Sequence, residues 1–317
     1  MGQLRRNLFM KRFAINMVAV ALLMVASVAS AEEHKATKVA QHLQDISVTI
    51  RAGGSQGSGV LISRMVKSKG KMVNINFVWT AAHVVDGLRS TRTIIGPNGS
   101  PKVLVEFRDV QILKEDQVDG RKVGEHVMDA KVVLYSDSEH GHDLALLMVR
   151  KPNFTISNAV FEPDHVCAVG TNLIHVGSLL GQAGSNSMTR GNVSQTGRVL
   201  QLGNGAGTLF DQTSCPAFPG SSGGGVFTAQ GKYMGMLVRG AGETFNLVVP
   251  VRRMYKYARK HNVLWALDKS VPVPSLSFID KINPEHAPTT SKKVRSKDSK
   301  KYSFLVGKLN PCDGAKK

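Results

Sequence analysis

The sequence predicts an all-β fold in which short strands fill two strand-rich halves of the chain. The first observation is a series of short apolar or alternating runs, separated by turn residues, along most of the chain. The second is composition: glycine is abundant at 31 residues, and aromatic residues make up only 6% of the chain. Tight turns between short strands use glycine because it adopts positive φ angles without steric cost. With 317 residues, the chain is also long enough to bury a sizeable core.

The expected strands form two sets. The first set comprises residues 46–52, 57–64, 72–79, 102–107, 129–136 and 143–150. The second set comprises residues 171–177, 192–202, 206–211, 225–229, 232–239 and 245–250. After the last strand, residues 251–261 carry apolar and aromatic side chains at helical spacing, which predicts a closing helix. We expect its basic residues to form a solvated face, namely Arg252, Arg253, Lys256, Arg259 and Lys260.

The N-terminus has the pattern of an export signal. Basic residues precede an uncharged stretch from Phe13 to Ala31, and this stretch ends in small residues. That order is typical of a secretory signal peptide, so we assign residues 1–31 to one. The protein is therefore expected to be exported, either periplasmic or secreted. The alternative is that residues 13–31 are retained as a membrane anchor.

The cysteines fit an exported protein. In an oxidising compartment, Cys167 and Cys215 could form a disulfide, which would leave Cys312 as the odd thiol. The spacing of cysteine and histidine does not indicate a zinc site, and we expect neither a metal nor another cofactor.

The charge is strongly basic, with a formal net value of +18. Residues 263–317 are predicted to form a basic, low-complexity and disordered tail. A solvated tail is the favoured interpretation. The alternative is a tail that binds an anionic partner, such as nucleic acid, lipid or a cell-wall polymer.

The chemistry is indicated by the segment Gly220-Ser221-Ser222-Gly223-Gly224. A serine held between glycines suits nucleophilic acyl transfer, because the sharp turn leaves backbone N–H groups free to face a developing oxyanion. The competing interpretation is a flexible Gly/Ser linker.

Two further segments favour the nucleophile over the linker. An apolar strand runs into His83, and Asp143 stands at the start of another apolar strand. A serine needs a base to accept its proton and an acid to orient that base. The sequence therefore predicts His83, Asp143 and Ser222 as a catalytic set.

These segments resemble the trypsin-like serine peptidases, and among them the HtrA/Do-like branch, from about Ser55 to Met254. The matching motifs are Gly57-Ser58-Gly59, Thr80-Ala81-Ala82-His83, Asp143-Leu144-Ala145-Leu146-Leu147, Val176-Gly177, Thr189-Arg190-Gly191, Pro219-Gly220-Ser221-Ser222-Gly223-Gly224 and Gly235-Met236-Leu237-Val238-Arg239-Gly240. The chain departs from the family pattern at Ser221, at Gly225 and at Cys215–Phe218.

The resemblance implies two six-stranded antiparallel β-barrels with the active site between them. After a lead-in at 32–43, residues 44–155 would form the first barrel, with His83 and Asp143. Residues 156–262 would form the second barrel, with Ser222, and the closing helix. No PDZ domain is expected after the second barrel, and therefore no PDZ-type regulation.

The resemblance also implies roles around the serine. The N–H groups of Gly220 and Ser222 would form the oxyanion hole. The residues expected to contact substrate are Pro216, Ala217, Phe218, Val238, Arg239 and Gly240. None of these is acidic, so we expect a small or medium apolar side chain before the cleaved bond.

The expected function is that of a serine endopeptidase that cleaves unfolded or exported proteins through an acyl-enzyme. One alternative is a dedicated processing protease, viral, phage-encoded or self-cleaving. The other is a basic, non-enzymatic binding protein built on a protease-like scaffold.

Overall fold

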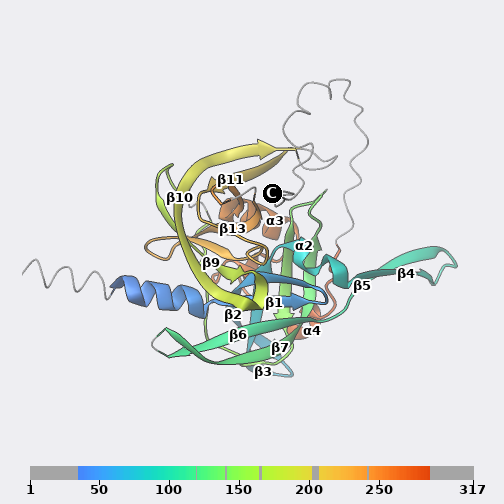
Figure 1. Ribbon diagram of the computed structural model, residues 1–317. Coiled ribbons are helices and arrows are strands. Elements are labelled where there is room, and N and C mark those ends of the chain that lie inside the picture. The colour runs from blue at the N-terminus through green and yellow to red at the C-terminus, as the bar shows by residue number, and fades with distance from the viewer. Residues whose placement is uncertain are drawn as a thin grey trace, which may run out of the picture. The chain divides into compact units, whose positions relative to one another are not determined.

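The computed structural model describes residues 35–118, 120–139, 141–163, 166–201, 207–240 and 243–285. The predicted signal peptide, Cys312 and the final part of the predicted tail lie outside these residues. The described chain is mostly β, as predicted, and most of its strands belong to two rings (Figure 1).

The first ring is a closed six-stranded barrel in the order β1-β2-β3-β8-β7-β6, with antiparallel neighbours throughout. Its strands are β1 (Ser47–Ala52), β2 (Ser55–Ser68), β3 (Lys71–Thr80), β6 (Val110–Val118), β7 (Arg121–Ser136) and β8 (Leu144–Val149). All six residues of β8 are buried, which fits a strand with neighbours on both sides. Thr80, the last residue of β3, pairs with Ala145 of β8, so the residues that follow β3 lie close to Asp143, which precedes β8.

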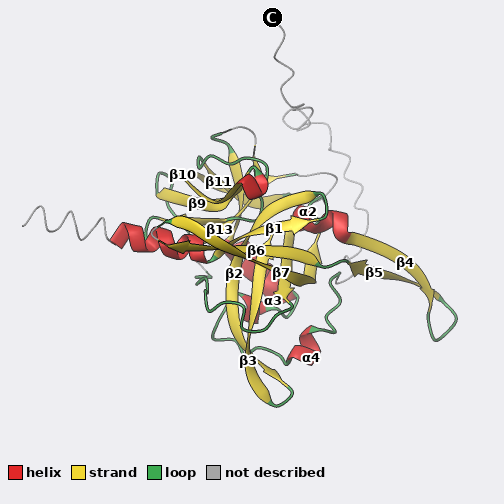
Figure 2. Cartoon of the chain, turned by 60° about the horizontal axis from the view of Figure 1, so that its bottom comes forward, coloured by secondary structure: helices red, strands yellow, loops and turns green. Residues whose placement is uncertain are grey.

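One strand of the first set was assigned wrongly. Residues 102–107 do form a strand, β5 (Pro101–Phe107), but it pairs with β4 (Arg89–Ile95) in a separate two-stranded ribbon. The ribbon extends away from the barrels (Figures 1 and 2). The sixth barrel strand is β6 instead, which the sequence analysis missed. Its polar residues obscure the alternation, and one of them, Lys114, is buried in the structure.

The second ring also has six antiparallel strands, in the order β10-β11-β14-β13-β12-β9. Its strands are β9 (Asn172–Leu179), β10 (Gly184–Leu200), β11 (Thr208–Thr213), β12 (Gly225–Thr228), β13 (Tyr233–Gly240) and β14 (Asn246–Pro250). Every strand predicted for this half is present, with shifted ends. The register of β13 against β14 is irregular between Leu237 and Arg239, so Val238 lies in a bulge.

Short helices join and close these rings. They are α2 (Ala82–Val85), η1 (Asp86–Leu88), η2 (Gly181–Ala183), α3 (Val251–Lys260), η3 (Leu264–Ala266) and α4 (Leu276–Ile279), and residues 35–45 are also helical. The predicted closing helix is thus confirmed as α3. Within the described residues, no helix is both long and apolar enough to cross a bilayer.

The stretch assigned to the tail begins with a packed segment. Residues 263–285 run along the first barrel, where the Trp79 indole donates a 2.9 Å hydrogen bond to the Ala266 carbonyl. The ring of Trp265 packs edge-on against Phe77, with centroids 4.9 Å apart. Arg64 of β2 donates to the Asp268 carbonyl at 2.7 Å. Through Trp265, Ala266 and Asp268, this part of the stretch is therefore packed against the first barrel.

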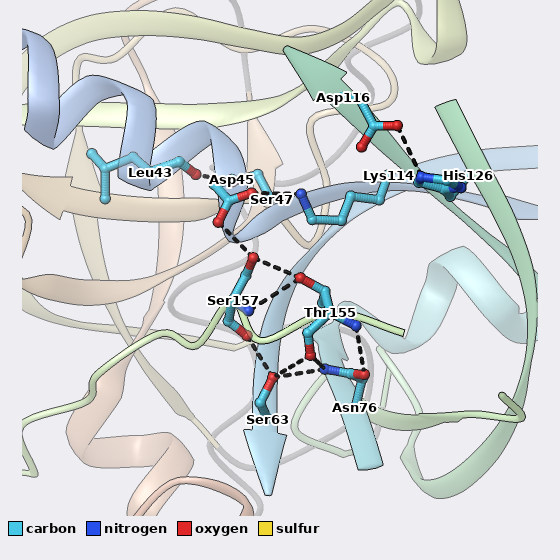
Figure 3. Close-up of polar contacts among 10 residues, drawn as sticks. All are labelled: Leu43, Asp45, Ser47, Ser63, Asn76, Lys114, Asp116, His126, Thr155 and Ser157. Atoms are coloured by element: carbon cyan, nitrogen blue, oxygen red, sulfur yellow. Dashed lines mark hydrogen bonds and ion pairs between the residues drawn. The ribbon is translucent and has the colours of Figure 1, made fainter. Parts of the chain in front are cut away.

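A polar network ties the start of the fold to the link between the two rings (Figure 3). Asp45 accepts hydrogen bonds from the Lys114 ammonium at 2.6 Å and from the Ser157 hydroxyl at 2.5 Å. Burial opposes ionisation of Asp45, but these hydrogen bonds outweigh it and lower the pKa of the carboxyl. Thr155, bonded to Ser157, also accepts a hydrogen bond from Asn76 of β3. The network therefore explains why Lys114 can be buried inside a barrel strand.

Candidate functional site

His83 is placed by a short helix at the end of β3. Its neighbours Ala82, Val84 and Val85 are buried, which anchors α2 against the barrel. The His83 side chain remains 33% exposed. The imidazole is therefore held at the surface by an anchored backbone.

Asp143 sits at the start of β8 in a left-handed conformation, with φ +54°. Aspartate is one of the few residues other than glycine that adopt this conformation, which is still less favourable than the extended or helical ones. Its N–H donates to the Asp137 carbonyl at 3.1 Å. The side chain is almost fully buried.

Asp143 and His83 are in direct contact. Both carboxylate oxygens lie 3.0 Å from Nδ1 of His83, and the backbone N–H of His83 donates to Oδ1 at 3.1 Å. A buried carboxylate in this position accepts a hydrogen bond from Nδ1–H, which leaves Nε2 of the neutral ring as an acceptor. That tautomer is the one a general base requires.

The serine loop is fastened to the first barrel by Ser58 of β2. The Ser58 N–H donates to the Ser222 carbonyl at 2.8 Å, and its hydroxyl donates to the Gly220 carbonyl at 2.7 Å. A methyl group on Gly223 would lie 2.1 Å from the Ser58 carbonyl oxygen, and Gly223 has φ +90°. Only glycine allows such a close approach here.

The same strand brings the serine loop to the histidine helix. A methyl group on Gly57 would lie 2.5 Å from a Val84 methyl and 3.1 Å from the Ser222 carbonyl oxygen. Gly57 is thus in contact with both the residue after His83 and the predicted nucleophile. The structure brings His83, Asp143 and Ser222 into one neighbourhood.

Two N–H groups of the serine loop point away from the contacts that hold the loop. The Pro219 carbonyl accepts from Leu180 at 2.7 Å, and the Ser221 carbonyl accepts from Gly224 at 3.0 Å. In a trans peptide the C=O and N–H groups point in opposite directions. The N–H of Gly220 therefore points away from Leu180, and that of Ser222 points away from Gly224.

The Ser222 hydroxyl has a long hydrogen bond, 3.4 Å, to the Val238 carbonyl. Val238 itself is buried, and its position in the bulge of β13 directs this carbonyl at the serine. Ser221, by contrast, is fully buried, and its hydroxyl accepts a hydrogen bond from the Phe218 N–H at 3.1 Å. The two serines therefore differ in setting: Ser221 supports the turn and Ser222 borders the surface.

The residues predicted to contact substrate are spread around this loop. Phe218 is exposed at 43%, whereas Ala217 packs on the smaller apolar core of the second ring. The Pro216 carbonyl accepts from Thr189 at 2.8 Å. The Arg239 guanidinium donates to the Ser138 carbonyl at 2.9 Å and so turns toward the segment before Asp143.

Gly240, the last of the residues predicted to contact substrate, lies against Asn246, which was not predicted to belong to the site. A methyl group on Gly240 would lie 2.1 Å from Oδ1 of Asn246. Asn246 is fully buried and donates to the Cys215 carbonyl at 2.8 Å. The side-chain amide of Asn246 therefore contacts both Gly240 and the Cys215 carbonyl.

Two buried residues near the site were also missed. Arg253 of α3, expected on a solvated face, is only 7% exposed and donates to the His142 carbonyl at 2.8 Å. His175 of β9 is fully buried behind Gly224, with Nδ1 3.1 Å from the Gly225 carbonyl. Burial lowers the pKa of His175 to about 4, so the ring is neutral at neutral pH. No pattern in the sequence distinguishes Arg253 and His175 from surface residues.

Cys167 and Cys215 are buried thiols in one apolar cluster, and the structure holds no disulfide between them. Burial raises the pKa of both thiols. Among the described residues, no group of three or more His, Cys, Asp or Glu side chains could hold a metal ion.

Comparison with known proteins gives one family match. The sequence model of the family described as trypsin-like peptidase domain matches residues 57–236, which is more than half of the chain. No curated protein matches at a significant level.

Two solved structures share the fold. The serine endoprotease from Yersinia pestis has a TM-score of 0.51 and 16% identity, with 73% of this chain and 66% of that chain covered. Deg5 has a TM-score of 0.51 and 19% identity, with 75% of this chain and 98% of that one covered. At such identities the likeness concerns the fold.

Proposed function

Because the chain belongs to the trypsin-like peptidase family, we propose that it is a serine endopeptidase and that His83, Asp143 and Ser222 perform the reaction. The observation that carries this proposal is the His83–Asp143 contact beside a serine loop fastened to the same barrel. The family resemblance makes proteins the substrate class.

In the proposed mechanism, Ser222 attacks the carbonyl of the bond to be cleaved while Nε2 of His83 accepts the hydroxyl proton. Asp143 holds the ring in the required tautomer and stabilises its protonated form. His83 then donates the proton to the leaving amine, and water hydrolyses the acyl-enzyme with His83 again as the base. The Ser222 hydroxyl donates its proton in a long, 3.4 Å hydrogen bond to the Val238 carbonyl, so in this step it must turn from that carbonyl to Nε2 of His83. Hydrogen bonds between a nucleophile and its base are often completed only when substrate binds.

The N–H groups of Gly220 and Ser222 would stabilise the oxyanion. Their orientation supports this role, since the carbonyls of Pro219 and Ser221 are both bonded on the opposite side. Donors fixed before the reaction stabilise the developing charge without reorganisation.

For substrate, we propose that an extended peptide pairs with the end of β13 near Val238 and Gly240. The exposed ring of Phe218 would contact the side chain before the cleaved bond. We further propose that the protein acts after export, with the signal peptide removed behind Ala31. Intact-mass measurement of exported protein would test the cleavage point.

The test of the function is a serine-reactive fluorophosphonate probe. We expect the wild type and Ser221→Ala to be labelled, because Ser221 supports the turn without reaching the surface. Ser222→Ala should not be labelled and should not hydrolyse unfolded protein. If the folded wild type neither reacts nor hydrolyses unfolded protein, the proposal is wrong and the non-enzymatic alternative is favoured.

A further inference from the structure

We propose that Arg253 of α3 is a positioning residue for Asp143, holding the backbone that precedes it and placing a buried positive charge near its carboxylate. This inference rests on the proposed function, because it concerns the acid that orients His83. Arg253 lies on a different element from all three proposed catalytic residues, at the start of the closing helix.

The contacts of Arg253 converge on the residue before Asp143. Its Nη2 donates to the His142 carbonyl at 2.8 Å, and its Nε lies 3.4 Å from Nδ1 of the His142 ring. Its Nη1 donates to the Leu209 carbonyl at 3.0 Å. The guanidinium thereby bridges β11 of the second ring and the turn of the first barrel that carries Asp143.

Several contacts hold the backbone at this turn. Asp143 has φ +54°, and the His142 N–H donates to the Ser136 hydroxyl at 2.8 Å. The ring of His142 packs on Tyr257, one turn along α3 from Arg253, with centroids 4.8 Å apart. Residue 142 is therefore held through its N–H, its carbonyl and its ring, and two of these three contacts come from α3.

The charge of Arg253 is unusual for its surroundings. The side chain is 7% exposed and stacks 4.8 Å from the Phe210 ring centroid. None of the ion pairs found among the described residues involves it, and its hydrogen-bond acceptors are neutral groups. Burial lowers the pKa of Arg253 to about 10, and Asp143 is the charge that counteracts this lowering. A buried guanidinium without a partner is costly, which argues that the Asp143 carboxylate is its electrostatic counterpart.

His142 must stay neutral for this arrangement. Burial, together with the charge of Arg253, lowers the pKa of His142 to about 4, so Nδ1 can accept from the guanidinium at neutral pH. Arg253 thus contacts the turn only through neutral acceptors, while its charge acts on Asp143.

The test compares Arg253→Met with Arg252→Met on the same helix. Arg252 is ion-paired with buried Asp211, and no hydrogen bond or ion pair among the described residues links it to the Asp143 turn, so its variant controls for a destabilised helix. We expect Arg253→Met to lower kcat by about 10–100-fold with KM nearly unchanged, below the about 10⁴-fold that disabling the triad acid costs. Arg252→Met should keep the wild-type kcat under conditions where it is folded.

Chemical rescue separates positioning from general damage. In Arg253→Ala, millimolar guanidinium chloride should restore kcat at least several-fold, while sodium chloride at the same ionic strength should not. Arg253→Met should not respond, because its side chain fills the site. Failure of rescue in folded Arg253→Ala, or equal losses of kcat in the two methionine variants, would overturn the inference.

A spectroscopic measurement distinguishes this inference from the proposed function. The Nδ1 proton of His83, shared with Asp143, should give a low-field proton resonance in the wild type and in Arg252→Met. The resonance should shift or vanish in Arg253→Met. If it does so although no form of the protein cleaves peptides, the positioning role stands and the proposed function fails. An unchanged resonance would contradict the positioning role.

Discussion

The backbone N–H of Leu180 donates a 2.7 Å hydrogen bond to the carbonyl of Pro219. Leu180 makes this contact from a left-handed conformation, with φ +62°, and is followed by Gly181 at φ +72°. The bond fixes the peptide that joins Pro219 to Gly220, and so it sets the direction of the Gly220 N–H. The turn after β9 therefore controls a group that we propose to bind the oxyanion.

A methyl group at Gly220 should disrupt this arrangement. The added carbon would lie 2.2 Å from the Ser178 carbonyl oxygen and 2.5 Å from the Gly181 nitrogen, and Gly220 has φ +95°. Both obstacles are backbone atoms, so the loop itself must move. We expect Gly220→Ala to lower kcat by about 10²–10³-fold, the cost of losing one oxyanion donor. Turnover of a fluorogenic peptide measures the effect.

Gly197→Ala is the matched control for that variant. Gly197 also has a positive φ, +73°, but among the described residues the added methyl would meet only a Leu209 methyl, at 4.0 Å. It should lose about 1–2 kcal/mol of stability from backbone strain and keep its kcat. Equal losses of kcat in both variants would show that strain alone, rather than the position of the oxyanion donor, limits activity.

Removing the hydroxyl of Ser58 should affect the same loop from the first barrel. This hydroxyl donates to the Gly220 carbonyl and accepts from the Ser178 N–H, both at 2.7 Å. Ser58→Ala removes the partner of the buried Ser178 N–H and of the half-buried Gly220 carbonyl. Leaving a buried polar group unpaired costs about 1–3 kcal/mol. We expect a lower unfolding free energy and a kcat reduced by about tenfold, since 1.4 kcal/mol of lost transition-state stabilisation is a factor of ten.

Ser47→Ala provides the comparison for Ser58→Ala. The Ser47 hydroxyl is also buried and donates to the Leu43 carbonyl at 2.8 Å, away from the serine loop. Urea unfolding and kcat measured on both variants separate stability from positioning. A Ser58→Ala protein that loses stability but keeps full kcat would contradict the role assigned to Ser58.

Stability should fall with acidification because of His175. Its pKa is about 4 in the folded protein, below the ordinary 6.5, since burial disfavours the charged ring. The unfolded chain therefore takes up a proton at higher pH than the folded chain does. The contribution is complete above about pH 6.5 and is lost as the pH falls toward 4. The stability lost relative to neutral pH is about 2–3 kcal/mol at pH 4.5.

The measurement is urea unfolding of wild type and His175→Leu at about pH 7 and about pH 4.5. His142 has a similarly lowered pKa and remains in both proteins, so the difference between them isolates His175. The variant should lose about 2–3 kcal/mol less than the wild type on acidification. Parallel losses would mean that His175 is not the neutral, buried group described above.

Much of the fold could be predicted because most barrel strands are apolar or alternate regularly. The strand β6 was missed since Lys114 is buried there by its contact with Asp45, a residue far away in the sequence. The strand β5 was wrongly placed in the barrel because its residues are largely apolar. In the structure it pairs with β4 outside the barrel, and Val103 is 63% exposed there. Local pattern identifies a strand, but it does not identify the partner of that strand.

In the candidate site, too, local sequence pattern identifies some residues, whereas others are identified only by tertiary packing. His83, Asp143 and Ser222 stand in motifs whose local sequence matches the chemistry that we propose for them, and these motifs could be found without a structure. Arg253 could not, because it follows Arg252 in the same basic run and only tertiary packing buries it.

The neighbouring ion pair of Arg252 with Asp211 gives the last prediction. Asp211 is fully buried, and Arg252 contacts its two oxygens at 2.6 and 2.7 Å. Arg252→Met leaves the carboxylate buried without its charge partner, which should cost about 3–5 kcal/mol of unfolding free energy. Adding Asp211→Asn should recover much of this loss, because the amide carries no charge and can still accept from the Gly197 N–H. Urea unfolding of the two single variants and the double variant measures the coupling. If the two losses simply add, the Asp211 carboxylate is stabilised by its other contacts, and Arg252 does not hold the start of α3 against β11.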